Sequence, residues 1–148
     1  MAKSYMDKRK VIEDLVSQWI KIAERDLLTA KQGLKSEIVV TDTVSFHCQQ
    51  AVEKYLKAFL VNNQIEFSKT HSVMVLLNLC STVDKSFKEE LSEADYLTDY
   101  AVEIRYPDEW YEPTTEEAKQ AYEMALRVKS FVLDKLKITQ TNEVHTES

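Results

Sequence analysis

Turn-forming residues are scarce in this chain. It contains one glycine and two prolines among its 148 residues. A β-rich domain of this length needs many more turn residues, so the scarcity favours a few long helices with short connections. The length corresponds to a single domain that is large enough to bury a core. The sequence therefore predicts an all-α fold.

Apolar residues recur with helical spacing along most of the chain. They predict five helical segments, at residues 8–34, 41–63, 70–80, 85–106 and 115–136. The fourth segment could break near Ser92. Long segments with short connections predict an antiparallel up-and-down four-helix bundle with an additional short helix. The domain is expected to span residues 8–137, with flexible tails at 1–7 and 138–148.

Several residues are expected to mark the ends of these helices. Gly33 lies where the first helix would end, and glycine suits a left-handed residue at that position. Thr41 or Asp42 can cap the second helix. Thr114, with Glu117 three residues later, resembles a capping box for the fifth helix.

Charge and composition exclude several classes of function. A net charge of −6 argues against broad binding to nucleic acid, so DNA is not an expected partner. No apolar run approaches the roughly 20 residues that cross a bilayer, and no signal-peptide core follows the N-terminus. We therefore expect a cytoplasmic protein without a membrane partner. Cys48 and Cys80 are expected to be reduced, and neither a metal site nor a cofactor is expected.

Asp26 and Arg105 are the charged residues that the helical pattern places inside. Asp26 shares a buried stripe with Trp19, Ala23 and Ala30, and a buried carboxylate needs a partner. Arg105 is permanently charged and offers a planar set of donors. The two residues are predicted to pair. Either the pair is structural, or Arg105 is held at a helix end to bind an anion.

The second helix carries a polar face beside its apolar one. Spacings of 3, 4 and 3 place four residues on this face: His47, Gln50, Lys54 and Lys57. A solvated face is one interpretation. The other is a surface that contacts a phosphate or another chain. His71, at the start of the third helix, is expected to order the turn by hydrogen bonding.

Aromatic and acidic residues follow Arg105. Flat rings on which a base could stack are offered by Tyr106, Trp110 and Tyr111. Three acidic residues in the same segment repel phosphate: Asp108, Glu109 and Glu112. The segment is therefore either a helix connector or one side of a binding site.

Four motifs in order resemble the HEPN family. They are W-x3-A-x2-D-L-x2-A from Trp19 to Ala30, FHCQQAVEKYLKAFL from Phe46 to Leu60, KTHS from Lys69 to Ser72, and RYPD from Arg105 to Asp108. The resemblance covers residues 10–136 and implies a bundle of four long helices, usually a homodimer. Family members include small proteins encoded beside minimal nucleotidyltransferases, some acting as toxin and antitoxin.

Many HEPN proteins are metal-independent ribonucleases that use an arginine and a histidine with four to six residues between them. The corresponding positions after Arg105 hold Trp110, Tyr111 and Glu112. Tyrosine, with an ordinary pKa of about 10, is a poor base. The resemblance therefore favours binding over catalysis.

Three functional hypotheses follow. The first is a homodimeric module that binds a nucleotide or an RNA phosphate and works with a nucleotidyltransferase partner. Its expected ligand-binding residues are Arg105, Asp26, Lys54, His47 and Tyr106. The second is a ribonuclease toxin with altered catalytic residues, namely Arg105, Tyr111 and His47. The third is a purely structural dimer. Apolar residues left outside the core suggest the dimer surface: Ile20, Ile22, Val61 and Phe67.

Overall fold

The computed structural model describes residues 2–102 and 106–138, and these residues form helices without any strand. The elements are α1 (Ala2–Lys35), α2 (Thr41–Asn62), α3 (Val73–Ser81), α4 (Ser86–Leu91), the 3-10 helices η1 (Ser92–Ala101) and η2 (Pro107–Glu109), and α5 (Thr115–Leu136). The all-α prediction is confirmed. Within the same residues, no helix is both long enough and apolar enough to cross a membrane.

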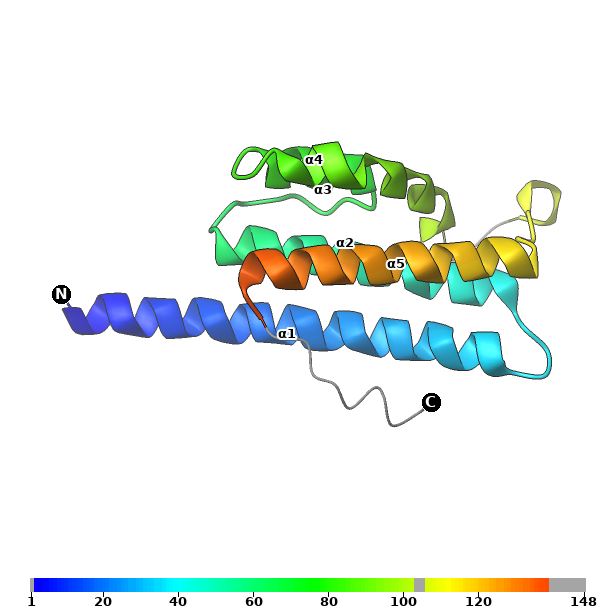
Figure 1. The fold of residues 1–148 in the computed structure, drawn as a ribbon, viewed down its shortest axis with the longest axis horizontal. Coiled ribbons are helices and arrows are strands. Elements are labelled where there is room, and N and C mark those ends of the chain that lie inside the picture. Colours follow the sequence, from blue (N-terminus) through cyan, green and yellow to red (C-terminus); the bar gives the residue numbers. More distant parts are fainter. Residues whose placement is uncertain (1, 103–105, 139–148) are drawn as a thin grey trace.

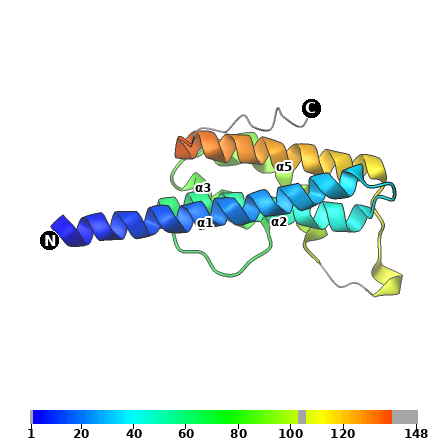
Figure 2. The same ribbon diagram turned by 90° about the horizontal axis from the view of Figure 1, so that it is seen from below.

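The helices form an up-and-down bundle around α2. In Figure 1, α1 and the α4–η1 segment run one way, whereas α2 and α5 run the other. The α4–η1 segment takes the fourth position of the bundle, and α3 is the additional short helix. Helix α2 contacts α1, α3, α5 and η1, and is therefore the central element. The N-terminal end of α1 projects beyond the other helices (Figures 1 and 2).

Aromatic side chains connect the layers of the core. The Phe87 ring lies 4.3 Å from the Phe59 ring and 5.0 Å from the Phe131 ring, measured between centroids. These contacts join α4 to α2 and α5. A polar contact joins the three long helices, because Glu24 accepts hydrogen bonds from Tyr55 at 2.6 Å and Lys129 at 3.1 Å.

The predicted role of Gly33 is wrong. Helix α1 begins at Ala2 rather than near Lys8 and continues to Lys35, so Gly33 lies inside it and has no positive φ. The residue is needed for a different reason. A Cβ atom at Gly33 would lie 2.8 Å from Cγ2 of Val44, closer than real Cβ atoms come. Gly33 allows α1 and α2 to approach each other closely.

The cap predicted from local sequence is present at the start of α5 but not at the start of α2. The predicted capping box of α5 is confirmed, since Thr114 Oγ1 accepts from Glu117 N at 3.0 Å and Glu117 Oε1 accepts from Thr114 N at 2.8 Å. The predicted cap of α2 is wrong. Val40 occupies the N-cap position without a side-chain hydrogen bond, and Thr41 is a buried residue inside the helix.

The fourth predicted helix breaks where expected. At Ser92 the α-helix becomes a 3-10 helix, and the Ser92 hydroxyl donates to the carbonyl of Lys88. Helix η1 ends at Ala101, earlier than predicted. Tyr106 has an extended backbone, with φ −76° and ψ 150°, as is typical of a residue before proline. The predicted helix end at Arg105 lies outside the described residues.

The two cysteines are free and buried. Burial raises the pKa of Cys48 to about 12 and the pKa of Cys80 to about 12. Both thiols are therefore packing groups that stay protonated at neutral pH.

Candidate functional site

A cluster of three charged and polar residues joins α1 to α2. Asp26 on α1 is buried, and each of its carboxylate oxygens has one partner on α2. Oδ1 lies 2.8 Å from Nδ1 of His47, and Oδ2 lies 2.6 Å from Nζ of Lys54. His47 and Lys54 can both reach Asp26 because they lie about two helical turns apart on one face. We call these three residues the Asp26 cluster.

The Asp26 cluster is partly open to solvent. The side chains of His47 and Lys54 are 27% and 21% exposed, against 11% for Asp26. An ionised carboxylate only accepts hydrogen bonds, so the proton of neutral His47 is on Nδ1 and its Nε2 is an acceptor. Lys54 neutralises Asp26 and keeps further N–H donors that can contact a ligand.

The structure thus brings together three of the predicted ligand-binding residues. Arg105, the fourth, lies outside the described residues, so its predicted pairing with Asp26 stays a prediction. Both Asp26 oxygens already have partners, so the carboxylate does not depend on Arg105 for its stability. Tyr106, the fifth, is 71% exposed on the connection that leads to α5.

Tyr111 forms a hydrogen bond with a residue outside the Asp26 cluster. Its hydroxyl donates to Oε1 of Glu117 on α5 at 2.7 Å. This hydrogen bond raises the pKa of Tyr111 and lowers the pKa of Glu117. A raised pKa makes the Tyr111 phenol a weaker acid. The phenol therefore stays protonated at neutral pH and cannot accept a proton. The neighbouring Trp110 donates from Nε1 to Asp42 at 3.4 Å, which holds the connection against the start of α2.

A second polar cluster lies on α2 and was not predicted from the sequence. Glu53 is buried, and its carboxylate accepts from Nζ of Lys57 at 3.1 Å and Nδ1 of His71 at 2.9 Å. It also accepts from the side-chain amide of Gln49. The Lys57 ammonium lies 5.7 Å from the ring of Trp19. We call these residues around the Glu53 carboxylate the Glu53 cluster.

The sequence contained one signal for the Glu53 cluster. Glu53 and Lys57 have the i,i+4 spacing of a helical ion pair. Position 53 also follows Gln49 by four residues, and both side chains lie on the buried side of α2. The third partner, His71, is 18 residues away, and no local pattern indicates that contact. The expectation that His71 orders its turn by hydrogen bonding agrees with this geometry.

A pocket of about 670 Å³ adjoins the Glu53 cluster, between α2 and η1. Its lining residues are Phe46, Gln50, His71, Ser72, Thr98, Ala101 and Val102. The Phe46 ring also packs edge-on against the ring of His47, with centroids 5.4 Å apart. The pocket, which we call the α2–η1 pocket, therefore lies next to the Asp26 cluster.

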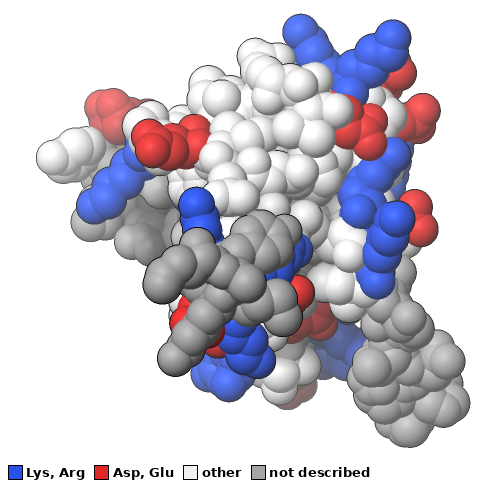
Figure 3. Space-filling view, turned by 90° about the vertical axis from the view of Figure 1, so that its left-hand side faces the viewer, with Lys and Arg blue, Asp and Glu red and all other residues white. Residues whose placement is uncertain are grey.

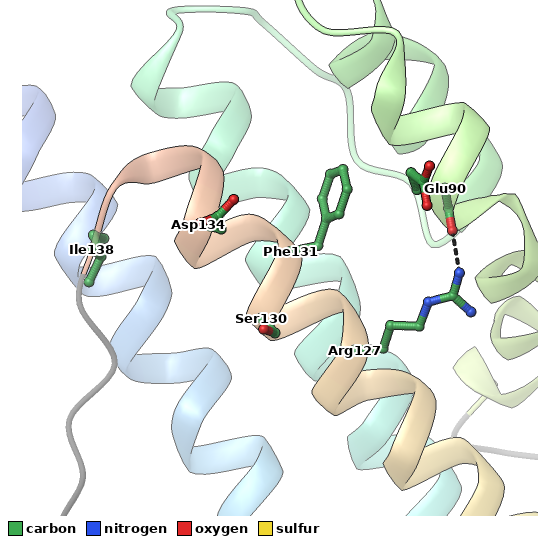
Figure 4. A pocket seen from close by; sticks show the side chains of 6 residues that line it. All are labelled: Glu90, Arg127, Ser130, Phe131, Asp134 and Ile138. Carbon is green, nitrogen blue, oxygen red and sulfur yellow. Dashed lines mark hydrogen bonds between the residues drawn. The ribbon is translucent and has the colours of Figure 1, made fainter.

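A second pocket, between α4 and α5, is a poorer candidate. Figure 4 shows Arg127 turned toward α4, where it donates to the backbone carbonyl of Glu90 at 2.7 Å. The same guanidinium contacts Glu93 at 2.9 Å. These contacts attach α5 to α4 and η1. The Arg127 guanidinium is therefore already engaged with groups of the protein. Asp134 also lines this pocket and would repel an anion.

The end of the molecule seen in Figure 3 carries charges of both signs side by side, around an area of uncharged residues. This face has no extended patch of positive charge among the described residues. It is therefore unlike the basic surfaces that bind nucleic acid without regard to sequence.

Comparisons with known proteins agree with this architecture. The HEPN domain model matches residues 16–136, most of the chain. The chain belongs to the HEPN family. The HEPN chain is 34% identical over 129 residues to the protein named "Putative toxin MJ1304" from Methanocaldococcus jannaschii, covering 80% of this chain and 84% of that protein.

Two solved structures share the HEPN fold of this chain. One is the crystal structure of ST0689, an archaeal HEPN homologue, with 27% identity and a TM-score of 0.62. The alignment covers 81% of this chain and 96% of that one. The other is the crystal structure of TT1696 from Thermus thermophilus, with 28% identity and a TM-score of 0.67, covering 81% and 97%.

Proposed function

We propose that this HEPN protein is a toxin-like binding module that holds an RNA or nucleotide phosphate. The observation that carries the proposal is the Asp26 cluster. It places the ammonium of Lys54 and the ring of His47 together at a partly exposed position between α1 and α2. Lys54 has donors left for a phosphate oxygen. Arg105 supplies the permanent cation.

The wider biological role rests on similarity. The relative from Methanocaldococcus jannaschii is named as a toxin, which supports a toxin-like role for this chain. The resemblance to HEPN proteins encoded beside minimal nucleotidyltransferases supports a nucleotidyltransferase partner. The same resemblance supports a homodimer, and we propose that it acts in the cytoplasm.

The ribonuclease hypothesis has one observation in its favour. Asp26 orients His47 through Nδ1 and leaves Nε2 available, the arrangement that an acid–base histidine needs. Tyr111 does not strengthen this hypothesis, because its hydrogen bond to Glu117 raises the pKa of the phenol. Binding without cleavage is therefore the favoured function.

Binding of a single-stranded RNA of about ten nucleotides tests the proposal by fluorescence anisotropy. Arg105→Ala and Lys54→Gln should each weaken binding at least about tenfold, because each removes a cation from the phosphate site. Lys10→Ala is the matched control. Lys10 is 72% exposed on α1, and its removal changes the net charge by the same amount as Lys54→Gln.

The outcomes separate the three hypotheses. Wild-type affinity in both Arg105→Ala and Lys54→Gln would overturn the proposal and leave the structural dimer. Gel analysis of the same RNA after incubation reports cleavage. Cleavage that His47→Asn abolishes would replace the binding hypothesis with the ribonuclease hypothesis.

A further inference from the structure

The α2–η1 pocket has a hydrogen-bonding pattern that specifies its ligand. We propose that it binds a nucleobase that carries an exocyclic amino group, with His71 and Gln50 as the acceptors of that group. This inference rests on the proposed function. The phosphate contacts do not specify the base of the nucleotide, and the pocket would. It adds a recognition site next to the Asp26 cluster.

The acceptor on His71 follows from Glu53. The Glu53 side chain is 3% exposed and forms an ion pair with Lys57 at 3.1 Å. Because a carboxylate only accepts hydrogen bonds, Nδ1 of neutral His71 must carry the proton that faces it at 2.9 Å. Nε2 of His71 is then an acceptor. The His71 side chain is 67% exposed and lines the pocket.

The acceptor on Gln50 follows from the same carboxylate through one more residue. Gln49 must direct its amide nitrogen toward Glu53, so its carbonyl oxygen is free to accept. Gln50 donates its own amide nitrogen to that oxygen at 2.8 Å. Beyond this hydrogen bond, the Gln50 side chain keeps its carbonyl oxygen as an acceptor and its second N–H as a donor. Gln50 therefore presents an acceptor to the pocket that it lines.

Several other polar groups near the pocket are already engaged. Oγ1 of Thr98 accepts from Val73 N at 3.0 Å and contacts Asp95 at 3.2 Å. The next backbone N–H groups of α3 donate to the side chains of Asp95 and Ser72. These donors at the start of α3 are therefore not available to attract an anion. A phosphate only accepts hydrogen bonds, so it does not match the acceptors on His71 and Gln50.

The walls of the pocket suit a flat ring. Phe46 lies on one side, and Ala101 and Val102 contribute further apolar surface. An aromatic ring is a surface on which a base can stack. Because Phe46 also contacts His47, a nucleotide with its base here has its phosphate on the side of the Asp26 cluster.

A pair of nucleotides that differ only in the amino group tests the inference. Adenosine 5′-monophosphate carries the 6-amino group, and purine riboside 5′-monophosphate lacks it, with the same ribose and phosphate. Isothermal titration should show that the first binds about five- to tenfold more tightly, the value of one or two net hydrogen bonds. His71→Asn and Gln50→Met should each bring this ratio close to one.

Lys54→Gln is the control for the phosphate side. It should weaken both nucleotides alike and leave their ratio unchanged. The ratio of the two nucleotide affinities does not depend on the fraction of protein that is folded. The comparison therefore remains valid for a variant that is destabilised. Gln50→Met provides a second test that leaves the His71–Glu53 contact in place.

Three outcomes would overturn the inference. One is equal affinity of the wild-type protein for the two nucleotides. Another is an unchanged ratio in both His71→Asn and Gln50→Met. The third is failure to bind adenosine 5′-monophosphate at millimolar concentration. None of these results decides the proposed function, which is tested separately by RNA binding of Arg105→Ala and Lys54→Gln.

Discussion

Nδ1 of His71 lies 2.9 Å from the buried carboxylate of Glu53, 18 residues earlier in the chain. This contact attaches the connection between α2 and α3 to the central helix. Glu53 is in turn paired with Lys57, whose side chain is 13% exposed. Polar residues of α2 thus take part in two carboxylate–lysine–histidine clusters, one centred on Asp26 of α1 and one on Glu53. Both depend on a mainly buried acid.

Removing the Glu53 carboxylate should destabilise the protein strongly. Glu53→Ala leaves Lys57 buried without its counterion and should cost about 3–5 kcal/mol of unfolding free energy. Urea denaturation measures this loss. Glu53→Leu combined with Lys57→Met should recover most of it, because the pair is replaced by apolar side chains. Equal losses in the single and double variants would show that the ion pair is not the cause.

Gly33→Ala should destabilise the contact between α1 and α2. The new methyl group would lie 2.8 Å from Val44 Cγ2, and overpacking of this kind costs about 1–3 kcal/mol. A better helix propensity offsets up to about 1 kcal/mol of this cost. In a Val44→Ala background the same substitution should be neutral or stabilising, as thermal denaturation would show. A similar loss in both backgrounds would contradict the predicted clash.

The stability contribution of Asp84 should disappear in acid. The hydrogen bond from Lys135 is the main cause that lowers the pKa of Asp84 from 3.8 to about 2, and Ser86 adds to it. A lowered pKa stabilises the fold above the unfolded value, and this contribution is lost as pH falls from about 4 through 2.

Thermal denaturation of the wild type and Asp84→Asn checks this expectation. At pH 6 the wild type should be more stable by about 1 kcal/mol or less, because the pair with Lys135 is partly exposed. The difference should close at the lowest pH at which the protein still folds. A difference that is the same at every pH would exclude the carboxylate as its source.

Asp26→Asn should separate stability from binding. It leaves Lys54 without a counterion and should cost about 1–3 kcal/mol, since the site is partly open to water. It also frees a positive charge, so RNA binding at low salt should be retained or strengthened. Anisotropy titrations at several salt concentrations measure this. Loss of binding equal to that of Arg105→Ala would show that Asp26 itself is required for the ligand contact.

We expect a homodimer in solution. Of the residues named from the sequence, Ile22 is 44% exposed, and Ile20, Val61 and Phe67 are partly buried. Val11 and Leu15 extend the exposed apolar stripe of α1 on the side of Ile22. Multi-angle light scattering at tens of micromolar should report a dimer. Ile22→Glu should shift it to a monomer, while a wild-type monomer would contradict the expectation.

Local signals predicted the parts of the fold that depend on local interactions. The capping box of α5 and the break at Ser92 involve residues three or four positions apart, and both are confirmed. The predicted role of Gly33 is wrong, because the close approach of α1 and α2 decides it. The predicted cap of α2 is also wrong, since its N-cap is Val40. No window of sequence contains the packing of α1 against α2.

The candidate site could also be predicted only in part, because tertiary contacts decide which of its residues meet. The need of Asp26 for a partner followed from its position on an apolar stripe. Which cation would meet it depended on the tertiary arrangement, and the structure places His47 and Lys54 there. Both had been assigned to the polar face of the second helix. The contact of Glu53 with His71 joins two segments whose sequences show no relation.

The central position of α2 has a practical consequence for identifying the ligand. Helices α1, α3, α5 and η1 all pack on it, so the chain cannot release α2 without losing its core. A ligand held by residues of α2 therefore binds only the intact fold. At a hundred times its dissociation constant it would add about 2.7 kcal/mol to the unfolding free energy. For a chain of this length, each kcal/mol corresponds to about 2–4 °C. A melting-temperature screen of nucleotides and short RNAs can thus find the ligand without an activity assay.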